Sequence, residues 1–171
     1  MILRHMLSIL LLPFLVAVIV PFVFLNELAS YDTHWGNDSL YVWLPRSTGI
    51  GLIMLGLGMF TWCVSLFVRI GRGTLAPWDP TRNLVVVGPY RFVRNPMISG
   101  VAVILVGEAL FCGSCIVGLW ACLFVLFNHV YFVFFEEPDL ETRFGEPYRV
   151  YKNNVPRWIP RPLLSQSRPS H

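Results

Sequence analysis

The sequence has few charged side chains, which a soluble protein of this size needs on its surface. Only 13% of the 171 residues are charged, whereas 55% are hydrophobic and 15% are aromatic. This composition argues against a soluble fold and indicates an integral membrane protein with a single domain over residues 1–171. The net charge of +3 is small and spread along the chain, so nucleic acid is not an expected partner. The chain also has no internal repeat and no low-complexity tract.

Four apolar segments are candidates for transmembrane helices, and about 20 residues of helix are needed to cross the hydrocarbon core. Three of them contain no Asp, Glu, Lys or Arg, whereas the third in chain order is shorter and contains Glu108. We predict an all-α membrane protein with four spans, over residues 7–25, 47–68, 97–111 and 115–135. The first segment also resembles the apolar part of a signal peptide, but it is longer than usual and no A-x-A cleavage site follows it.

The distribution of Lys and Arg predicts the orientation of the spans. The N-terminal segment and the loop 26–46 carry one such residue each, the loop 69–96 carries five, and the chain after residue 135 carries six. Because cytoplasmic loops are enriched in Lys and Arg, we predict that both termini and the loop 69–96 lie in the cytoplasm. The loop 26–46 combines acidic with aromatic residues and is predicted to lie at the outer membrane interface.

Small residues indicate how the spans pack and turn. The sequence "CGSC" predicts a tight hairpin between the last two spans. Its pair Cys112 and Cys115 can be redox-active or bind a metal, but no second C-x-x-C and no βαβ pattern supports that interpretation. We therefore interpret both as small turn residues and expect no metal site. One closely packed helix face is predicted in the second span from its glycines, which are Gly49, Gly51, Gly56 and Gly58.

The residues after the last span predict a short amphipathic helix on the membrane face. Pro138 with its acidic neighbours is a favourable helix start, because acids suit the positive end of the helix dipole. Three prolines end this helix, beginning with Pro156, and the tail 162–171 is predicted to be mobile. An apolar stripe at four- and three-residue spacing is formed by Leu140, Phe144, Tyr148 and Tyr151.

Two polar clusters are predicted to meet at the cytoplasmic end of the last two spans. One runs from Arg82 to Pro96 and includes part of "GPYRFVRNPMISG", and the other is the pair Glu136 and Glu137. A hairpin of the two spans brings these clusters together, with guanidinium and amide donors facing carboxylates. Such a pocket fits a ligand with a carboxylate, an amine and an aromatic group that rests on Tyr90, such as an amino-acid-bearing nucleoside. The simpler alternative is that the arginines contact lipid phosphates and the acids only cap a helix.

Asn128 and His129 are polar residues inside the last predicted span. His129 precedes Glu136 by seven residues, which places the two on nearly the same helix face, about 10 Å apart along the axis. Polar and ionisable residues in spans are costly and commonly functional. We therefore predict catalytic roles for both, with His129 as the best-placed base. The alternative is that His129 only bonds to a neighbouring helix. We interpret Glu108 as a residue that makes a structural hydrogen bond within the bundle.

The stretch "GPYRFVRNPMISG" followed by "EEPDLETRFGEPYRVYKNNVPRWIPR" resembles the isoprenylcysteine carboxyl methyltransferase family, including its small bacterial members. Phospholipid N-methyltransferases share the same broad architecture. The resemblance covers about residues 69–161 and implies a membrane methyltransferase that binds S-adenosylmethionine at the cytoplasmic end of its spans, without a Rossmann domain. For a bacterial member the membrane is the inner one. By position, the resemblance implies these cofactor-binding residues: Arg82, Asn83, Leu84, Val85, Tyr90, Asn95, Pro96, Met97, Ile98 and Glu136.

Three positions depart from the eukaryotic members of that family. Asn95 stands where they have His, and Ile98 stands where they have Tyr, although Asn95 can still donate and accept hydrogen bonds. Phe132 stands where they place the arginine that holds the carboxylate of the substrate. The predicted acceptor is therefore a lipophilic molecule that enters from the bilayer. It is either a carboxylate like that of isoprenylcysteine, bound by another cation such as Arg157, or another lipid, thiol or amine nucleophile.

Methyl transfer from a sulfonium depends on alignment and desolvation of the nucleophile more than on a proton donor. A site inside the membrane admits lipophilic acceptors from the side while the cofactor enters from water. Two other classes of protein remain open at this point. One is a nicotinamide-dependent membrane reductase of the sterol reductase type, which normally has many more spans. The other is a non-enzymatic helical scaffold or lipid-binding protein.

Overall fold

The computed structural model describes residues 13–32, 40–71 and 83–160, and these ranges are built from helices. The predicted all-α class is confirmed. The elements labelled η1, η3 and η5 are π-helical turns, and η2 and η4 are 3₁₀ turns. In chain order the elements are η1 (Leu15–Ile19), α2 (Val20–Glu27), η2 (Leu40–Val42), α3 (Trp43–Leu66), η3 (Phe67–Gly71), η4 (Gly88–Arg91), α4 (Pro96–Cys112), α5 (Cys115–Tyr131), η5 (Phe132–Glu136), α6 (Glu137–Phe144) and α7 (Glu146–Asn154).

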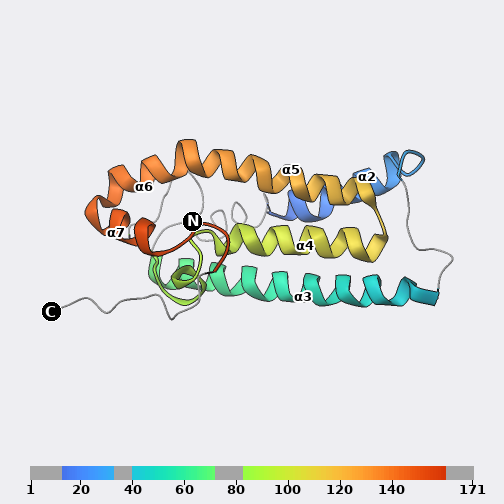
Figure 1. The fold of residues 1–171 in the computed structure, drawn as a ribbon, viewed down its shortest axis with the longest axis horizontal. Helices are drawn as coiled ribbons and strands as arrows, with labels where there is room; N and C mark the ends of the chain where they lie inside the picture. Colours follow the sequence, from blue (N-terminus) through green and yellow to red (C-terminus); the bar gives the residue numbers. More distant parts are fainter. Residues whose placement is uncertain (1–12, 33–39, 72–82, 161–171) are drawn as a thin grey trace.

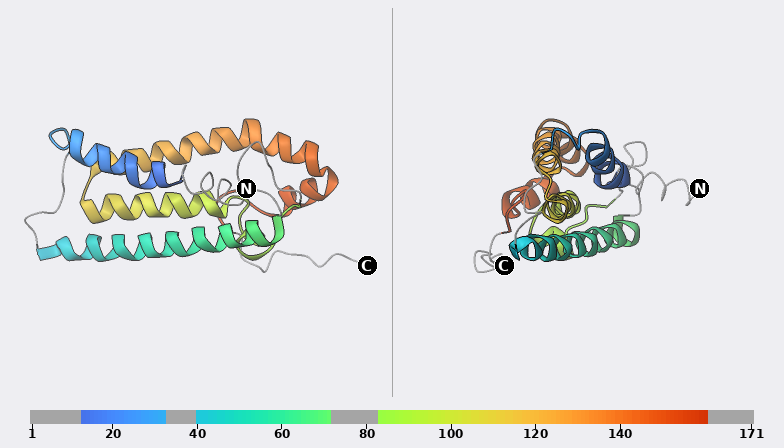
Figure 2. Two further views of the ribbon diagram at one scale, coloured as in Figure 1. Left: turned by 180° about the vertical axis from the view of Figure 1, so that it is seen from behind. Right: turned by 90° about the vertical axis from the view of Figure 1, so that its right-hand side faces the viewer.

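The helices α3, α4 and α5 run side by side along the molecule, and α2 lies beside α5 (Figure 1). Seen from the end, α4 lies between α3 and α5 (Figure 2). The core is centred on α4, whose residues Val101, Ile104 and Leu105 are 2%, 7% and 0% exposed. Cys63 of α3 and Ala121 of α5 belong to the same buried cluster. Because α4 is covered by its neighbours, most of the surface that meets lipid comes from the other helices.

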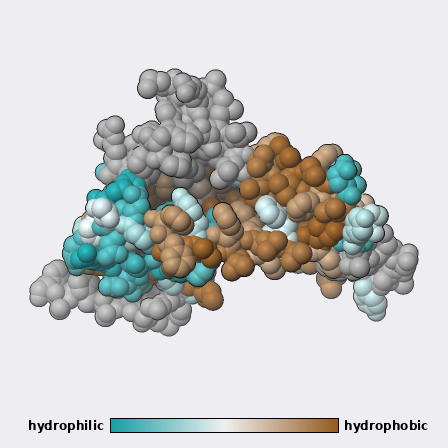
Figure 3. Space-filling view, turned by 90° about the horizontal axis from the view of Figure 1, so that it is seen from above, coloured by the Kyte–Doolittle hydropathy of each residue, from teal (hydrophilic) through white to brown (hydrophobic). Residues whose placement is uncertain are grey.

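In the described part of the chain, two continuous helices are long and apolar enough to cross a membrane, Trp43–Ile70 with 28 residues and Cys115–Phe144 with 30. Only 17% of the most apolar window of each is buried inside the protein, so these are not core helices of a soluble fold. On the face seen in Figure 3, hydrophobic residues form a band along the middle and hydrophilic residues gather at the end that holds α6 and α7. Such an exposed apolar band is the surface that lipid covers.

Three predicted spans, 47–68, 97–111 and 115–135, each lie inside an observed run of helix. The predicted span 7–25 overlaps the shorter apolar helix Leu15–Glu27, and its first residues lie outside the described part of the chain. The tail 162–171, predicted to be mobile, lies outside the described part as well.

Glycine pairs bring the backbones of α3 and α4 into direct contact. A Cβ atom on Gly49 would lie 2.6 Å from the carbonyl oxygen of Gly107. A Cβ atom on Gly56 would lie 2.6 Å from the carbonyl oxygen of Gly100. Only a residue without a side chain permits this approach, so the predicted close packing of the second span is confirmed for this pair of positions.

The other two glycines of α3 do not take part in that contact. No atom outside the helix lies within 4 Å of the Cβ positions of Gly51 and Gly58. The prediction that all four glycines share one face was wrong, because residues two apart in an α-helix differ by about 200° around the axis.

Among the described residues, a π-helical turn precedes a proline at two places. In η5 the N–H of Glu137 bonds to the carbonyl oxygen of Phe132, five residues earlier, and Pro138 follows. The same pattern stands before Pro21, at the junction of η1 and α2. Proline has no N–H and its ring clashes with the carbonyl four residues earlier, which the wider turn relieves. The predicted helix start at Pro138 was therefore wrong, because one helix continues from α5 through η5 into α6.

The predicted C-terminal amphipathic helix is two helices, because Gly145 interrupts it. Gly145 has φ 59° and ψ −132°, a conformation that residues with a side chain rarely adopt. The chain turns there between α6 and α7 (Figure 1). In α7, Tyr148 is 2% exposed, and Tyr151 donates a hydrogen bond to the Tyr90 carbonyl. Tyr148 and Tyr151 therefore pack against the protein. The sequence led us to expect both of them on the membrane face.

Helices α4 and α5 form the predicted hairpin. Gly113, with φ 65°, ends α4, and the side chain of Ser114 caps α5. Asp32, from much earlier in the chain, accepts a hydrogen bond from Ser114 Oγ and from the first two N–H groups of α5, the latter at 3.0 and 3.3 Å. A carboxylate at a helix N-terminus satisfies donors and suits the helix dipole, so Asp32 fixes the end of the hairpin.

Candidate functional site

The candidate site lies at the end of the bundle where α4 begins and where α5 continues through η5 into α6 (Figure 1). The predicted meeting of two polar clusters occurs here. Arg94, from the loop that enters α4, lies 2.9 Å through Nη1 from Oε1 of Glu137. The two motifs of the sequence are therefore brought together by the hairpin of α4 and α5.

Tyr90 lies at the centre of this end of the molecule. Its side chain is 6% exposed, its ring centroid is 5.7 Å from that of Phe67, and its side chain is hydrogen-bonded to that of Cys63. Burial raises the pKa of Tyr90 well above its ordinary value, and nearby groups, Glu136 among them, raise it further. The hydroxyl therefore keeps its proton. The influence of Glu136 also means that the structure brings these two predicted cofactor residues close together.

The residues before η4 approach Tyr90 from the side of α3. Val85 is 6% exposed and belongs to the same buried cluster as Tyr90, and Leu84 is half-buried. Asn83 Nδ2 donates a hydrogen bond of 3.1 Å to the carbonyl oxygen of Ile70 in η3. This bond holds the loop segment before η4 against the helical turn that follows α3. Arg82, the remaining predicted residue of this stretch, lies outside the described residues.

The predicted residues Asn95, Pro96, Met97 and Ile98 form the start of α4. Asn95 is the N-cap residue, yet its side chain makes no capping hydrogen bond. Its carbonyl oxygen instead accepts from the N–H and the hydroxyl of Ser99, at 3.1 and 2.9 Å. Pro96 follows at a position that suits its fixed φ. Pro96 and Met97 are buried, so Asn95 and Ile98 are the residues of this stretch with more exposed surface.

Glu137 is the electrostatic centre of the site, although only Glu136 of the predicted acidic pair was assigned to the cofactor. It is only 6% exposed. Its Oε1 accepts from Arg94 Nη1 at 2.9 Å and from Arg157 Nε at 2.7 Å. Its Oε2 lies 3.4 Å from Lys152 Nζ. A buried carboxylate without partners is strongly destabilising, so these three cations and Glu137 depend on one another.

His129 and Asn128 each have a partner within the protein. Trp158 Nε1 donates to Nδ1 of His129 at 3.0 Å, and the Asn128 amide donates to the carbonyl of Phe124 at 2.8 Å. An indole N–H is only a donor, so Nδ1 is the unprotonated nitrogen of His129 and a neutral imidazole carries its proton on Nε2. The alternative interpretation of His129, a bond to a neighbouring element, is the arrangement observed. A base role needs the same lone pair that Trp158 occupies.

Phe132 is buried on the same side as Trp158. It is 5% exposed, and its ring centroid lies 6.0 Å from that of Trp158 in an edge-on arrangement. Arg157, the predicted substitute for the missing arginine, comes from the same segment as Trp158, but its Nε is turned to Glu137. An acceptor carboxylate would have to compete with Glu137 for this guanidinium.

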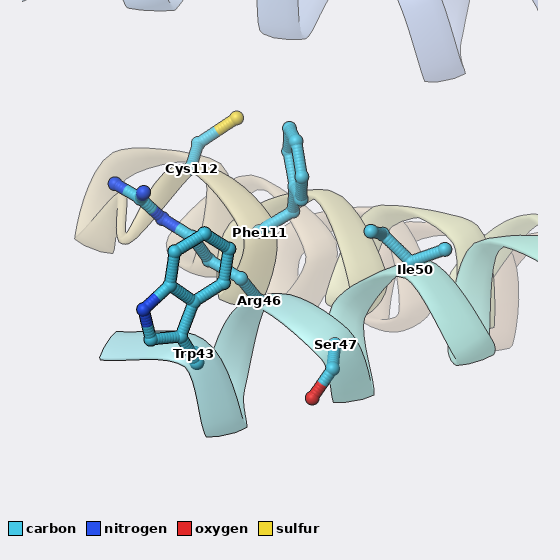
Figure 4. A pocket seen from close by; sticks show the side chains of 6 residues that line it. All are labelled: Trp43, Arg46, Ser47, Ile50, Phe111 and Cys112. Carbon is cyan, nitrogen blue, oxygen red and sulfur yellow. The ribbon is translucent and has the colours of Figure 1, made fainter. Parts of the chain in front are cut away.

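A separate hollow lies at the opposite end of the bundle, where α3 begins and α4 ends (Figure 4). Its volume is about 520 Å³ and its lining is mostly apolar. We assign the site to the other end, because converging ionisable and hydrogen-bonding groups, and not volume alone, carry chemistry. Within the described ranges, no group of three or more His, Cys, Asp or Glu residues could hold a metal ion. The hollow is lined by Trp43, Arg46, Ser47, Ile50, Phe111 and Cys112.

Comparison with known proteins shows a family and a relative. The family model described as phospholipid methyltransferase matches residues 45–147, more than half of the chain. A protein of Haemophilus influenzae, described as an uncharacterized protein, is 33% identical over 63 residues, which are 37% of this chain and the whole of that protein. No solved structure matches the chain. The matched region contains η4, α4, α5 and α6 and ends near the start of α7.

Proposed function

Because the chain belongs to the phospholipid methyltransferase family, we propose that it methylates a membrane lipid at the end of the bundle that holds Tyr90 and Glu136. Membership makes the chain a membrane methyltransferase that uses S-adenosylmethionine. The family match supports the reaction, and the 2.9 Å pair of Arg94 with Glu137, which joins the two motifs, supports the place. The kinship with isoprenylcysteine carboxyl methyltransferases is part of the proposal and rests on the two quoted motifs.

We propose four spans in a bacterial inner membrane, with both termini and the site facing the cytoplasm. The described cations support this orientation, because most of them belong to the site end, whereas Arg46 lies in the hollow at the opposite end. Lys and Arg are enriched on the cytoplasmic side of membrane proteins. A cytoplasmic site would give the water-soluble cofactor direct access.

We propose that Glu136 and Asn95 hold the polar part of S-adenosylmethionine. Glu136 is half-buried close to Tyr90 and suits an amino group, and the Asn95 side chain makes no capping bond in its own helix. Tyr90 is assigned to the floor of the site, since its ring is buried against Phe67. When bound, the cofactor supplies a methyl group on a sulfonium. The remaining proposed contacts are Arg82, Asn83, Leu84, Val85, Pro96, Met97 and Ile98.

We propose that the acceptor is a lipid nucleophile such as an amine, in preference to a carboxylate. Phe132 supplies no cation and Arg157 is held by Glu137, so an acidic acceptor lacks a partner. An amine must lose a proton before it attacks, and His129 is the proposed base for this step. For that role its Nδ1 must first release the N–H of Trp158. Asn128, one residue earlier, is proposed to orient the acceptor.

Calorimetry with S-adenosylhomocysteine on detergent-solubilised protein tests the proposed site. Glu136→Gln should bind about 10- to 150-fold more weakly, the effect of losing a hydrogen bond to a charged group. Glu146→Gln is the matched control, because Glu146 lies in an exposed ion pair at 3.8 Å and should leave affinity unchanged. Wild-type affinity in a folded Glu136→Gln protein would remove Glu136 from the site. Binding of NADPH, with no binding of S-adenosylhomocysteine, would overturn the proposed function.

A second experiment identifies the acceptor. The protein is incubated with labelled S-adenosylmethionine and a total lipid extract, and the labelled product is analysed by mass spectrometry. We expect the label on an amine-bearing lipid. A label found only on a carboxylate would refute the preference stated above.

A further inference from the structure

We infer that residues 146–158, here called the C-terminal strap, position the cofactor loop of residues 83–96, and that Glu137 and Tyr151 are the positioning residues. The inference rests on the proposed function of this end of the molecule. The family match ends at residue 147, so nearly all of the strap lies beyond the matched region. In the structure, however, the strap contacts the loop, α6 and α5, as the following bonds describe.

Two hydrogen bonds join the strap directly to the backbone of the loop. The Tyr151 hydroxyl donates to the carbonyl oxygen of Tyr90 at 2.7 Å. The N–H of Arg94 donates to the carbonyl oxygen of Pro156 at 2.9 Å. Burial raises the pKa of Tyr151 well above its ordinary value, so its hydroxyl remains a donor at physiological pH. Together the two bonds hold both ends of the segment 90–94, which leads into Asn95.

Glu137 joins the same two segments through their side chains. It binds Arg94 of the loop together with Lys152 and Arg157 of the strap. The Arg94 side chain is only 12% exposed, and its Nε is buried without a hydrogen-bond partner in the described residues. Arg94 therefore relies on Glu137 to compensate its charge. Removing that carboxylate would leave cations of two segments facing one another.

The end of the strap is anchored to α5. Trp158 donates to His129 at 3.0 Å and packs edge-on against Phe132. This anchor fixes the direction in which the strap crosses the site. It also means that the strap contacts both the proposed cofactor side, at Tyr90, and the proposed acceptor side, at His129.

The loop has little regular structure of its own to hold its shape. The backbone hydrogen bonds within the loop are short-range, such as that from the N–H of Tyr90 to the Val87 carbonyl at 3.3 Å and that from the N–H of Phe92 to the Pro89 carbonyl at 3.1 Å. A ligand site needs its contacting groups held within about 0.5 Å of the productive geometry. The bonds from the strap supply that restraint for the Tyr90–Asn95 region.

The test compares Tyr151→Phe and Glu137→Gln with the wild type in the full chain. Tyr151→Phe keeps the ring and removes only the donor, and should weaken S-adenosylhomocysteine binding about fivefold, as expected for one hydrogen bond. Glu137→Gln should weaken it at least about tenfold, because a charged partner is lost. Tyr131→Phe and Glu27→Gln are matched controls at exposed positions outside the strap and should bind as the wild type does.

Kinetics separate positioning from general stability. A positioning role predicts that KM for S-adenosylmethionine rises in both variants while kcat at saturating cofactor stays within about twofold. Wild-type affinity and KM in the Tyr151→Phe protein would overturn the inference, as would a lower Tm with unchanged KM. If Glu137→Gln does not fold, Tyr151→Phe decides the question alone. If the wild type itself does not bind S-adenosylhomocysteine, the proposed function fails, which is a different result from equal binding by all variants.

Discussion

Replacing Gly56 with alanine is expected to destabilise the protein, because α3 and α4 leave no room for the added methyl group. A Cβ atom at this position would lie 2.6 Å from the carbonyl oxygen of Gly100 and 2.7 Å from Cγ1 of Ile104. Ordinary contact begins at 3.4 Å, so the oxygen must move by 3.4 − 2.6 = 0.8 Å. A backbone oxygen cannot rotate out of the way as a side chain can. The two helices must therefore separate or bend.

The expected cost is about 2 kcal/mol, the middle of the range for overpacking a close-packed interior. Part of it comes from neighbours that lose contact when α4 shifts, including the fully buried Leu105. Gly58→Ala is the matched control, because no atom lies within 4 Å of its Cβ position. Alanine is the better helix former by up to about 1 kcal/mol, so this control should be neutral or stabilising.

Thermal unfolding of both variants in the same detergent measures the difference. For a chain of this length, a loss of about 2 kcal/mol lowers Tm by about 4–8 °C. Gly56→Ala should show that decrease and Gly58→Ala should show none. Equal Tm values for the two variants would refute the backbone contact between α3 and α4 as an essential feature of the fold.

Three further predictions concern the hairpin cap and the acceptor side of the site. Asp32→Ala should reduce the unfolding free energy by about 1–2 kcal/mol, measured by the same melts, because α5 loses its cap. Prenylcysteine analogues should be poor acceptors in a methylation assay, since Phe132 offers no cation, and efficient turnover would mean that Arg157 leaves its carboxylate partner. His129→Ala should lower turnover while S-adenosylhomocysteine affinity stays within about threefold, or ~0.7 kcal/mol. Normal turnover in the His129→Ala protein would leave His129 a partner of Trp158 only.

Much of the bundle could be predicted from runs of apolar residues. The hairpin at Cys112–Cys115 and the convergence of the two polar motifs follow from the lengths of the last two segments and the small residues between them. The break at Gly145 and the continuity through Pro138 could not be predicted. Proline next to acids is typical of a helix start, and only the tertiary fold decided that a π-turn would carry the helix past it.

The candidate site, like the fold, could be predicted from the sequence only in part. Neighbouring residues on a helix point about 100° apart, so a pair of acids such as Glu136 and Glu137 can place only one carboxylate in a given direction. The sequence placed both acids in one polar cluster and assigned only Glu136 to the cofactor, whereas the structure surrounds Glu137 with three cations. Which acid faces inward depends on the rotation of the whole helix, and packing far from the motif sets that rotation. The Tyr151 bond to Tyr90 was missed for a related reason, because a stripe of aromatic residues fits a membrane surface as well as a protein surface.

The unbroken helix Cys115–Phe144 fixes the depth of each of its residues in the membrane. Its 30 residues extend about 45 Å at helical rise, whereas the hydrocarbon core is about 30 Å thick. If its capped N-terminal end lies at one membrane interface, its last turns extend beyond the hydrocarbon at the opposite interface. At helical rise, His129 then lies about 21 Å and Glu136 about 32 Å along the helix from Cys115, which places His129 inside the hydrocarbon and Glu136 at its edge. Under the proposed function, a lipid whose nucleophile lies between these two depths would reach the methyl group without leaving the bilayer, and the fixed spacing would select acceptors by the depth of their reactive atom.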